Sequence, residues 1–124
     1  MPGLTNAEAA LVLDSAAGFP TSGGTDYIAY SANGTSETAS LTRTAIGATG
    51  WSAATVADPS VKSNANALTS ATASGAVTVT HFAIFSASTG GRQRTDWQAV
   101  TSSKTLAIGD TVTWASNSCS VTLT

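Results

Sequence analysis

The chain has 124 residues, with five Lys or Arg residues, seven Asp or Glu residues and a formal net charge of −2. This length is typical of one domain. The cations are scattered along the sequence, whereas binding to a polyanion needs several clustered cations. No stretch reaches the ~20 consecutive apolar residues of a membrane-spanning helix. Nucleic-acid binding and a membrane span are therefore both disfavoured.

Small side chains dominate the composition, with 23 Ala, 21 Thr and 17 Ser residues making up about half of the chain. Thr and Val suit the half-buried surface of a pleated sheet. A core built largely from small residues buries little apolar area, and a domain of this size is only marginally stable alone. We therefore expect a symmetric homo-oligomer, either a trimer or a dimer, because association stabilises the folded state.

The N-terminal segment predicts a short helix. Thr5 and Glu8 have the spacing of a capping box, and the residues that follow are good helix formers. Gly18 and Pro20 predict the end of the helix, so residues 1–18 form a helix or arm. This arm either covers the sheet or docks on a neighbouring subunit through an apolar stripe. The stripe contains Leu4, Leu11 and Val12, and Ala16 continues it.

Strand and turn signals occupy the first half of the chain after this helix. A strand is predicted over 27–31, with a turn at Asn33-Gly34 and a returning strand over about 38–46. Asp58-Pro59 predicts another turn, and a weaker strand is expected within 65–72.

The second half, residues 75–124, predicts a β-meander. Apolar residues alternate with Thr and Ser along 77–80, and the denser apolar segment 82–85 follows them. The turns are placed at 89–91 and Gly109-Asp110, and the last strand contains Cys119, Val121 and Leu123. A meander needs a second layer to cover its apolar face. We predict a single, mainly all-β domain over 1–124: a two-layer antiparallel β-sandwich of about seven to eight strands with a short N-terminal helix.

Candidate catalytic residues are few. His81 is the single histidine and lies inside a predicted strand, which favours a structural role. Four of the five Asp residues fall at predicted turns or strand starts, where they satisfy backbone amides. Cys119 is the single cysteine, so neither an intrachain disulfide nor a Cys/His metal site can form. We expect Cys119 to be a small core residue, with an intersubunit disulfide as the alternative. No enzyme activity, cofactor or metal is expected.

The three tryptophans leave one binding hypothesis open. Trp114 alternates with Val112 along a strand and is expected in the core. Trp51 and Trp97 lie near predicted loops. If they are exposed, their rings would serve for stacking on sugars.

Ordered segments of the second half carry a resemblance to a known family. The segments VTHFAIF (79–85), SASTGG (86–91), TSSKTLAIGDTVTW (101–114) and SVTLT (120–124) resemble the C-terminal half of small bacteriophage tail fibre or minor tail proteins. DYIAYS (26–31) and TASLTRTAI (38–46), which follows Glu37, extend the likeness more weakly. The loop between these two segments is shorter here than in that family. The resemblance implies a virion structural protein.

We therefore expect a non-enzymatic structural protein on the exterior of a tailed phage, either a capsid decoration protein or a minor tail component. Its partners would be major capsid or tail proteins. The absence of sequence repeats favours a compact module over a free-standing fibre. Met1–Leu4 lacks the basic start of a signal peptide, so synthesis in the host cytoplasm is expected.

Assembly would use the chain termini, by arm exchange or by addition of a strand to a neighbouring sheet. The candidate assembly contacts are Leu4, Leu11, Val12, Val121 and Leu123. The alternative function is a receptor- or glycan-binding tail module that contacts the host cell surface through Trp51 or Trp97.

Overall fold

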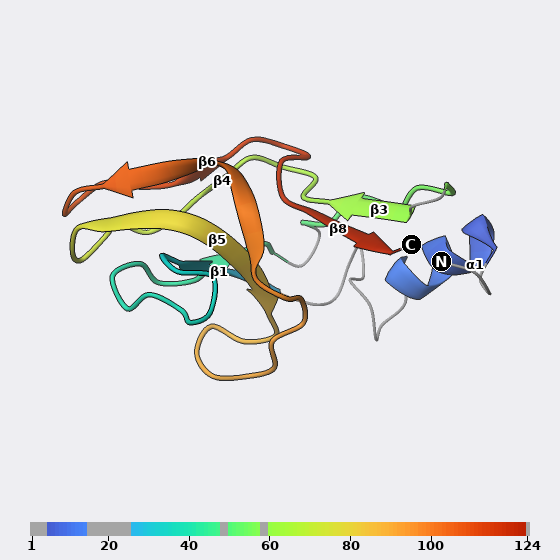
Figure 1. Cartoon of the computed structure of the whole chain (residues 1–124). Coiled ribbons are helices and arrows are strands. Elements are labelled where there is room, and N and C mark those ends of the chain that lie inside the picture. Colours follow the sequence, from blue (N-terminus) through green and yellow to red (C-terminus); the bar gives the residue numbers. More distant parts are fainter. Residues whose placement is uncertain (1–4, 15–25, 48–49, 58–59, 124) are drawn as a thin grey trace. The chain divides into compact units, whose positions relative to one another are not determined.

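The structure is a computed structural model that describes residues 5–14, 26–47, 50–57 and 60–123 (Figure 1). These residues contain one short helix and eight strands, and the paired strands of the sheets described below are antiparallel. The elements are α1 (Asn6–Asp14), β1 (Tyr27–Ser31), β2 (Thr44–Ala45), β3 (Ser60–Ser63), β4 (Leu68–Thr69), β5 (Val77–Phe85), β6 (Gln98–Leu106), β7 (Thr113–Trp114) and β8 (Ser120–Leu123). The predicted all-β class with a short N-terminal helix is confirmed.

The chain forms two compact units, each assembled from segments that are far apart in the sequence. Unit 1 contains residues 1–25, 46–67 and 114–124, and unit 2 contains residues 26–45 and 68–113. The chain therefore passes from one unit to the other after residues 25, 45, 67 and 113.

Unit 2 is built on a four-stranded sheet with the strand order β2-β1-β5-β6. Strand β1 lies in its interior and pairs with β5 from Tyr27 opposite Phe85 to Ser31 opposite His81. Its residues from Ile28 to Ser31 are fully buried, so both faces of this strand are covered. A strand covered on both faces is dominated by apolar and small residues, which explains the YIAYS sequence.

The predicted meander over residues 75–124 is wrong. Strands β5 and β6 form a hairpin, with an irregularity between Val79 and His81, but β8 pairs with β3. After the turn at Gly109 the chain does not return along β6. It pairs instead with residues 70–73, because Ala73 N donates to Asp110 O and Ser70 N donates to Val112 O, both at 2.8 Å. Alternation of apolar and hydroxyl residues identifies strands but does not identify their partners.

The predicted strand over 38–46 is also shorter than expected, since within this range the strand contains only Thr44–Ala45, although Thr38 N also donates to Tyr30 O of β1 at 2.9 Å. Residues 37–43 instead form a bend, in which the Arg43 guanidinium reaches back to the Glu37 carboxylate. The weaker strand expected within 65–72 is present as β4 alone.

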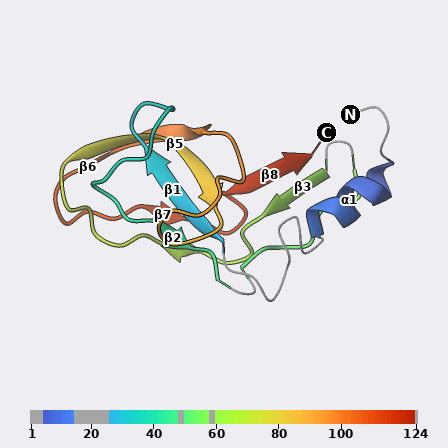
Figure 2. The same cartoon turned by 90° about the horizontal axis from the view of Figure 1, so that it is seen from below.

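Unit 1 contains the antiparallel pair of β3 and β8, with Ser60 opposite Leu123 and Ser63 opposite Ser120. The segment 51–55 runs along β3 as well, since Ser52 N donates to Ser63 O and Thr55 N donates to Val61 O. The helix α1 lies beside β3 (Figure 2). The apolar core of unit 1 contains Ala9, Ala10, Leu13, Ile46, Trp51, Trp114, Cys119 and Val121.

Candidate assembly site

The helix α1 begins as the sequence predicts. Glu8 N donates to the Thr5 hydroxyl oxygen at 3.2 Å, which satisfies one of the backbone amides left without a partner at a helix start. The helix ends at Asp14, and the predicted end near Gly18 lies outside the described residues.

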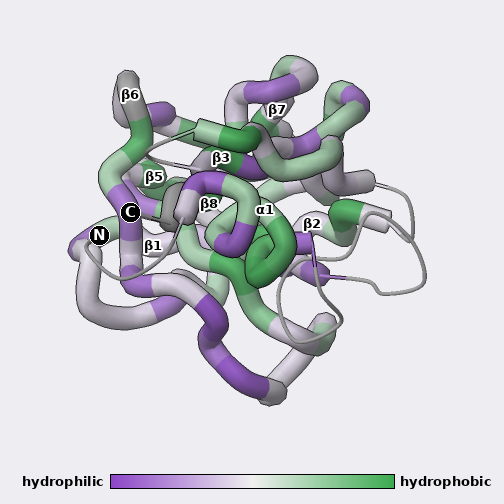
Figure 3. Tube along the Cα trace, turned by 90° about the vertical axis from the view of Figure 1, so that its right-hand side faces the viewer, coloured by the Kyte–Doolittle hydropathy of each residue, from purple (hydrophilic) through white to green (hydrophobic). Residues whose placement is uncertain are grey.

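Apolar residues occur on both sides of this helix. Ala9, Ala10 and Leu13 are buried in unit 1, whereas Leu11 is 62% exposed and Val12 is 46% exposed. In Figure 3 much of the α1 tube is coloured as hydrophobic. A helix that is apolar all round is usually covered all round. The sequence predicts an apolar stripe containing Leu11 and Val12, and the structure places these two residues on the side of α1 that faces solvent.

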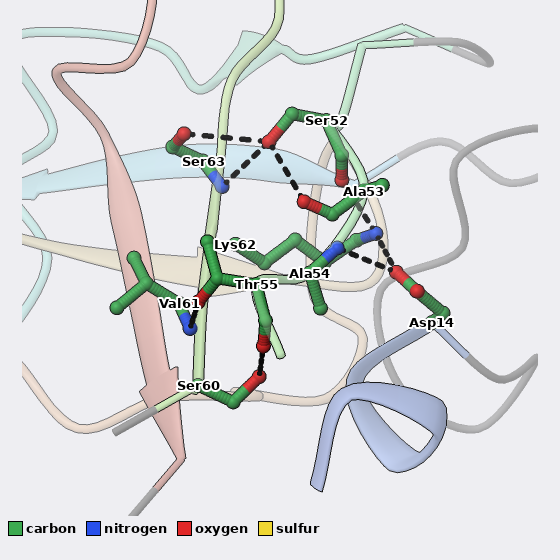
Figure 4. Close-up of polar contacts among 9 residues, drawn as sticks. All are labelled: Asp14, Ser52, Ala53, Ala54, Thr55, Ser60, Val61, Lys62 and Ser63. Carbon is green, nitrogen blue, oxygen red and sulfur yellow. Dashed lines mark hydrogen bonds and ion pairs between the residues drawn. The ribbon is translucent and has the colours of Figure 1, made fainter. Parts of the chain in front are cut away.

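A charged pair fastens the C-terminal end of α1 to β3 (Figure 4). The Lys62 side chain is completely buried, and its Nζ donates to Asp14 Oδ1 at 2.5 Å and to Ser52 O at 2.7 Å. Asp14 Oδ1 also accepts from the Ala54 amide at 3.0 Å. A buried ammonium is tolerated only when it is paired and hydrogen-bonded, as Lys62 is. These contacts fix the position of α1 relative to β3 within unit 1.

Neighbouring hydroxyls hold the segment that supplies the Ser52 carbonyl oxygen. Ser63 N donates to Ser52 Oγ at 3.3 Å, Ser60 Oγ donates to Thr55 O at 2.7 Å, and Val61 N donates to Thr55 Oγ1 at 2.9 Å (Figure 4). Hydrogen bonds of small hydroxyl side chains thus supplement the backbone hydrogen bonds between residues 51–55 and β3.

In the described part of unit 1, the pKa values of Asp14 and Cys119 are shifted. Partial burial raises the pKa of Asp14, but the hydrogen bonds from Lys62 and Ala54 and the Lys62 charge outweigh it and lower the pKa. Burial raises the pKa of the Cys119 thiol to about 12. The thiolate is the reactive form, so Cys119 is inert in the folded protein at neutral pH.

Comparison with protein families finds a match that covers residues 9–122. The family is described as podophage GP4 fiber I protein gp80. The chain belongs to this family. The predicted relationship to phage fibre proteins is therefore confirmed, and the protein is a virion structural component of the fibre class. A comparison with curated proteins found no match.

The structure does not place the other predicted assembly residues of this fibre-family protein at the surface with Leu11 and Val12. Leu4 and the side chain of Leu123 lie outside the described residues. Val121 is buried in unit 1 with the core residues, so its side chain offers no surface to a partner. Of the five predicted contacts, the structure therefore places Leu11 and Val12 at the surface.

The predicted sugar-stacking tryptophans are not exposed platforms in the fibre-family protein. Trp51 is only 3% exposed, and its backbone forms a bridge to Asn64 at the edge of β3. Trp97 is half-buried, and its ring packs against Phe85 with 6.0 Å between the ring centroids. Trp114 and Cys119 are buried, as the sequence predicts.

His81 has a structural environment. Its Nδ1 is 2.8 Å from the Thr80 hydroxyl, and its ring packs against Gly34, where an added Cβ would lie 3.0 Å from the ring. Within the described residues, no three His, Cys, Asp or Glu side chains gather as metal ligands. No helix in the same residues has the length and hydrophobicity needed to cross a membrane.

Sequence reasoning missed two features. Lys62 alternates with Val61 and Ser63, and this pattern alone gives no sign that the lysine points inward. Arg43 is one of the scattered cations of the sequence, and no motif marks it, yet its side chain is 7% exposed and connects two loops of unit 2.

Proposed function

We propose that this protein is a non-enzymatic subunit of the fibre of a tailed phage, and that it assembles through the exposed apolar side of α1. Membership of the fibre family supports the location. The observation that carries the mechanism is the exposure of Leu11 and Val12 on a helix whose opposite side is already buried.

The partner in this proposal is a second copy of the chain, in a closed dimer or trimer. Burying Leu11 and Val12 against a neighbour removes apolar surface from water, which is the main favourable term in protein association. The Asp14–Lys62 contact supports this role, because it holds the helix in one orientation before assembly. A preorganised surface loses less conformational entropy on binding.

The test is a sedimentation experiment on the full chain and on the double variant Leu11→Gln/Val12→Gln. Gln retains good helix propensity, so the helix itself should persist. We expect the wild type to sediment as an oligomer and the variant as a monomer with an unchanged circular dichroism spectrum. The matched control is Ile108→Gln, which changes an exposed apolar residue of unit 2 that is 74% exposed.

A monomeric wild type, or an oligomer that survives the double substitution, would contradict assembly of copies through α1. Placement on the particle needs a separate measurement, for which immunogold labelling of intact virions is suited. Label on the tail supports the fibre assignment, whereas dense label over the head would favour the alternative, capsid decoration.

A further inference from the structure

Unit 2 contains a loop that is held by several hydrogen bonds and an ion pair. Residues 86–97 connect β5 to β6, and Ser86 N donates to Arg92 O while Arg92 N donates to the Ser86 hydroxyl. Arg94 forms an ion pair with the buried carboxylate of Asp26, with 2.5 Å between Nη1 and Oδ1. Several of the exposed residues of this loop are therefore displayed on a fixed backbone.

Arg43 ties this loop to the bend at residues 37–43. Its Nη1 donates to Ala87 O at 2.8 Å and to Gly90 O at 2.7 Å, and its guanidinium carbon lies 3.9 Å from the centre of the Phe85 ring. Its Nε and Nη2 donate to the two carboxylate oxygens of Glu37 at 2.9 and 2.8 Å. Such a two-point ion pair also fixes the orientation of the carboxylate.

A pocket of about 320 Å³ lies between the two braced loops. This volume is at the lower end of the range for small-molecule sites. Its lining combines hydroxyl groups, a carboxylate and a guanidinium with the apolar residues Ala39 and Leu41. The lining residues are Glu37, Thr38, Ala39, Leu41, Thr42, Arg43, Ser88, Thr89 and Gly90.

The charges in this pocket are already matched. Four of the five N–H groups of Arg43 are committed to Glu37 and the loop carbonyls, so a phosphate or sulfate finds little free donor capacity. Glu37 has its counterion in place, which removes the attraction for a free amine. Each carboxylate oxygen retains lone pairs that can accept from a hydroxyl group. Thr42, Ser88 and Thr89 are exposed and add hydroxyls that both donate and accept.

We propose that this pocket binds an uncharged saccharide, a ring of hydroxyl groups recognised by Glu37 and by the hydroxyls of Thr42, Ser88 and Thr89. No aromatic ring lines the pocket, so single-site affinity should be weak, in the millimolar range. Several copies in one fibre would compensate through multivalency. The proposal goes beyond assembly through α1, since every residue of the pocket belongs to unit 2 and Leu11 and Val12 belong to unit 1.

The experiment is an NMR titration of the full, ¹⁵N-labelled chain with glucose, galactose, mannose and N-acetylglucosamine. Three charged comparators, N-acetylneuraminic acid, glucosamine and glucose 6-phosphate, are titrated in parallel. We expect at least one neutral sugar to shift amide signals within 37–43 and 88–90 in a saturable way. Thr42→Val and Thr89→Val should each weaken that binding about five- to tenfold, as expected for loss of one hydrogen bond.

The matched control is Thr72→Val, which removes an exposed hydroxyl of unit 2 that does not line the pocket. It should leave the affinity unchanged. The proposal is overturned if no neutral sugar shifts these signals, if a charged comparator binds more tightly, or if the Thr42 and Thr89 variants bind as well as the wild type. Because Leu11→Gln/Val12→Gln leaves the pocket intact, sugar binding by that variant separates failure of this proposal from failure of assembly through α1.

Discussion

At the scale of single residues, Lys62 shows what a core of small side chains permits. Ser60, Lys62 and Asn64 all point inward from one short stretch, and each finds polar partners. Among the described residues, no buried side-chain nitrogen or oxygen lacks a hydrogen-bond partner. Unit 1 is therefore held by a polar network as well as by apolar contacts, and such networks are sensitive to the loss of one member.

Asp14→Asn should destabilise the protein by about 2 kcal/mol. It leaves the Lys62 ammonium buried without a counterion, which costs roughly 3–5 kcal/mol in a dry site and less here, because the Asp14 side chain is 34% exposed. Urea unfolding measures the loss. Asp14→Asn/Lys62→Met should recover most of it, and Asp96→Asn, at an exposed position, serves as the control. An unchanged urea midpoint for Asp14→Asn would show that the pair contributes nothing.

The same pair should make stability depend on acid pH. Because the pKa of Asp14 is lower in the folded than in the unfolded chain, the unfolded chain binds the proton first as pH falls. The contribution is full above the unfolded pKa, about 3.9, and is lost as pH falls through the lower folded pKa. Unfolding free energy measured from pH 6 to pH 2 should therefore fall less steeply at the acid end in Asp14→Asn than in the wild type.

At the scale of elements, local sequence signals predicted where the helix and the strands lie better than they predicted which strands pair. Thr5 and Glu8 gave the helix start, and the strands at 27–31 and 77–85 follow apolar and β-branched runs. The partner of β8 could not be predicted, because β3 lies about sixty positions earlier in the sequence and carries no complementary motif. Long-range pairing is decided by the packing of the whole chain, and single-sequence patterns do not record it.

The candidate sites also differ in how far a local sequence pattern predicts them. Leu11 and Val12 were identified from helical spacing, which is a local property. The pocket of unit 2 combines residues 37–43 with residues 88–90, and its formation depends on where Arg43 places its guanidinium. Trp51 is buried and so does not serve as the predicted binding residue. Its burial could not be predicted, because the residues that cover it are distant in the sequence.

Arg43→Lys should loosen the loop at 86–97 without unfolding the sheet. Lysine cannot reproduce the two-point contact with Glu37 together with the cation–π contact of the guanidinium over the Phe85 ring. We expect hydrogen exchange at the amides of Ser86, Arg92 and Arg94, which donate hydrogen bonds in this loop, to accelerate about tenfold, while the amides of β1 and the rest of β5 remain protected. Arg92→Lys, at an exposed position in the same loop, is the control. Equal protection in both variants would show that Arg43 does not brace the loop.

At the scale of the whole molecule, the connectivity of the two units determines how the chain can be dissected. Each unit is interrupted by segments of the other, so neither corresponds to a continuous fragment. Removal of residues 1–18 would also remove Asp14 and leave the buried Lys62 without this counterion. Point substitutions on α1 are therefore a cleaner test of assembly than truncation.

The chain should unfold in one cooperative transition. If unit 2 unfolded alone, residues 26–45 and 68–113 would become long loops closed by unit 1, and closing such loops costs free energy. The fully buried Cys119 is a reporter for unit 1. Its reaction with a thiol reagent and the loss of far-UV circular dichroism should have the same urea midpoint. Two separated midpoints would contradict this cooperativity.

Three of the five basic residues are used inside the protein: Lys62 and Arg94 pair with Asp14 and Asp26, and Arg43 pairs with Glu37. Among the Lys and Arg residues of the described part of the chain, Arg92 and Lys104 are the two that are classed as exposed. A surface with so few positive charges exerts little long-range attraction on an anionic cell envelope. Salt therefore has little electrostatic attraction to screen. If the pocket of unit 2 binds a saccharide of a bacterial surface, as proposed above, the rate of encounter should change little between dilute and concentrated salt, and short-range contact should decide which encounters last.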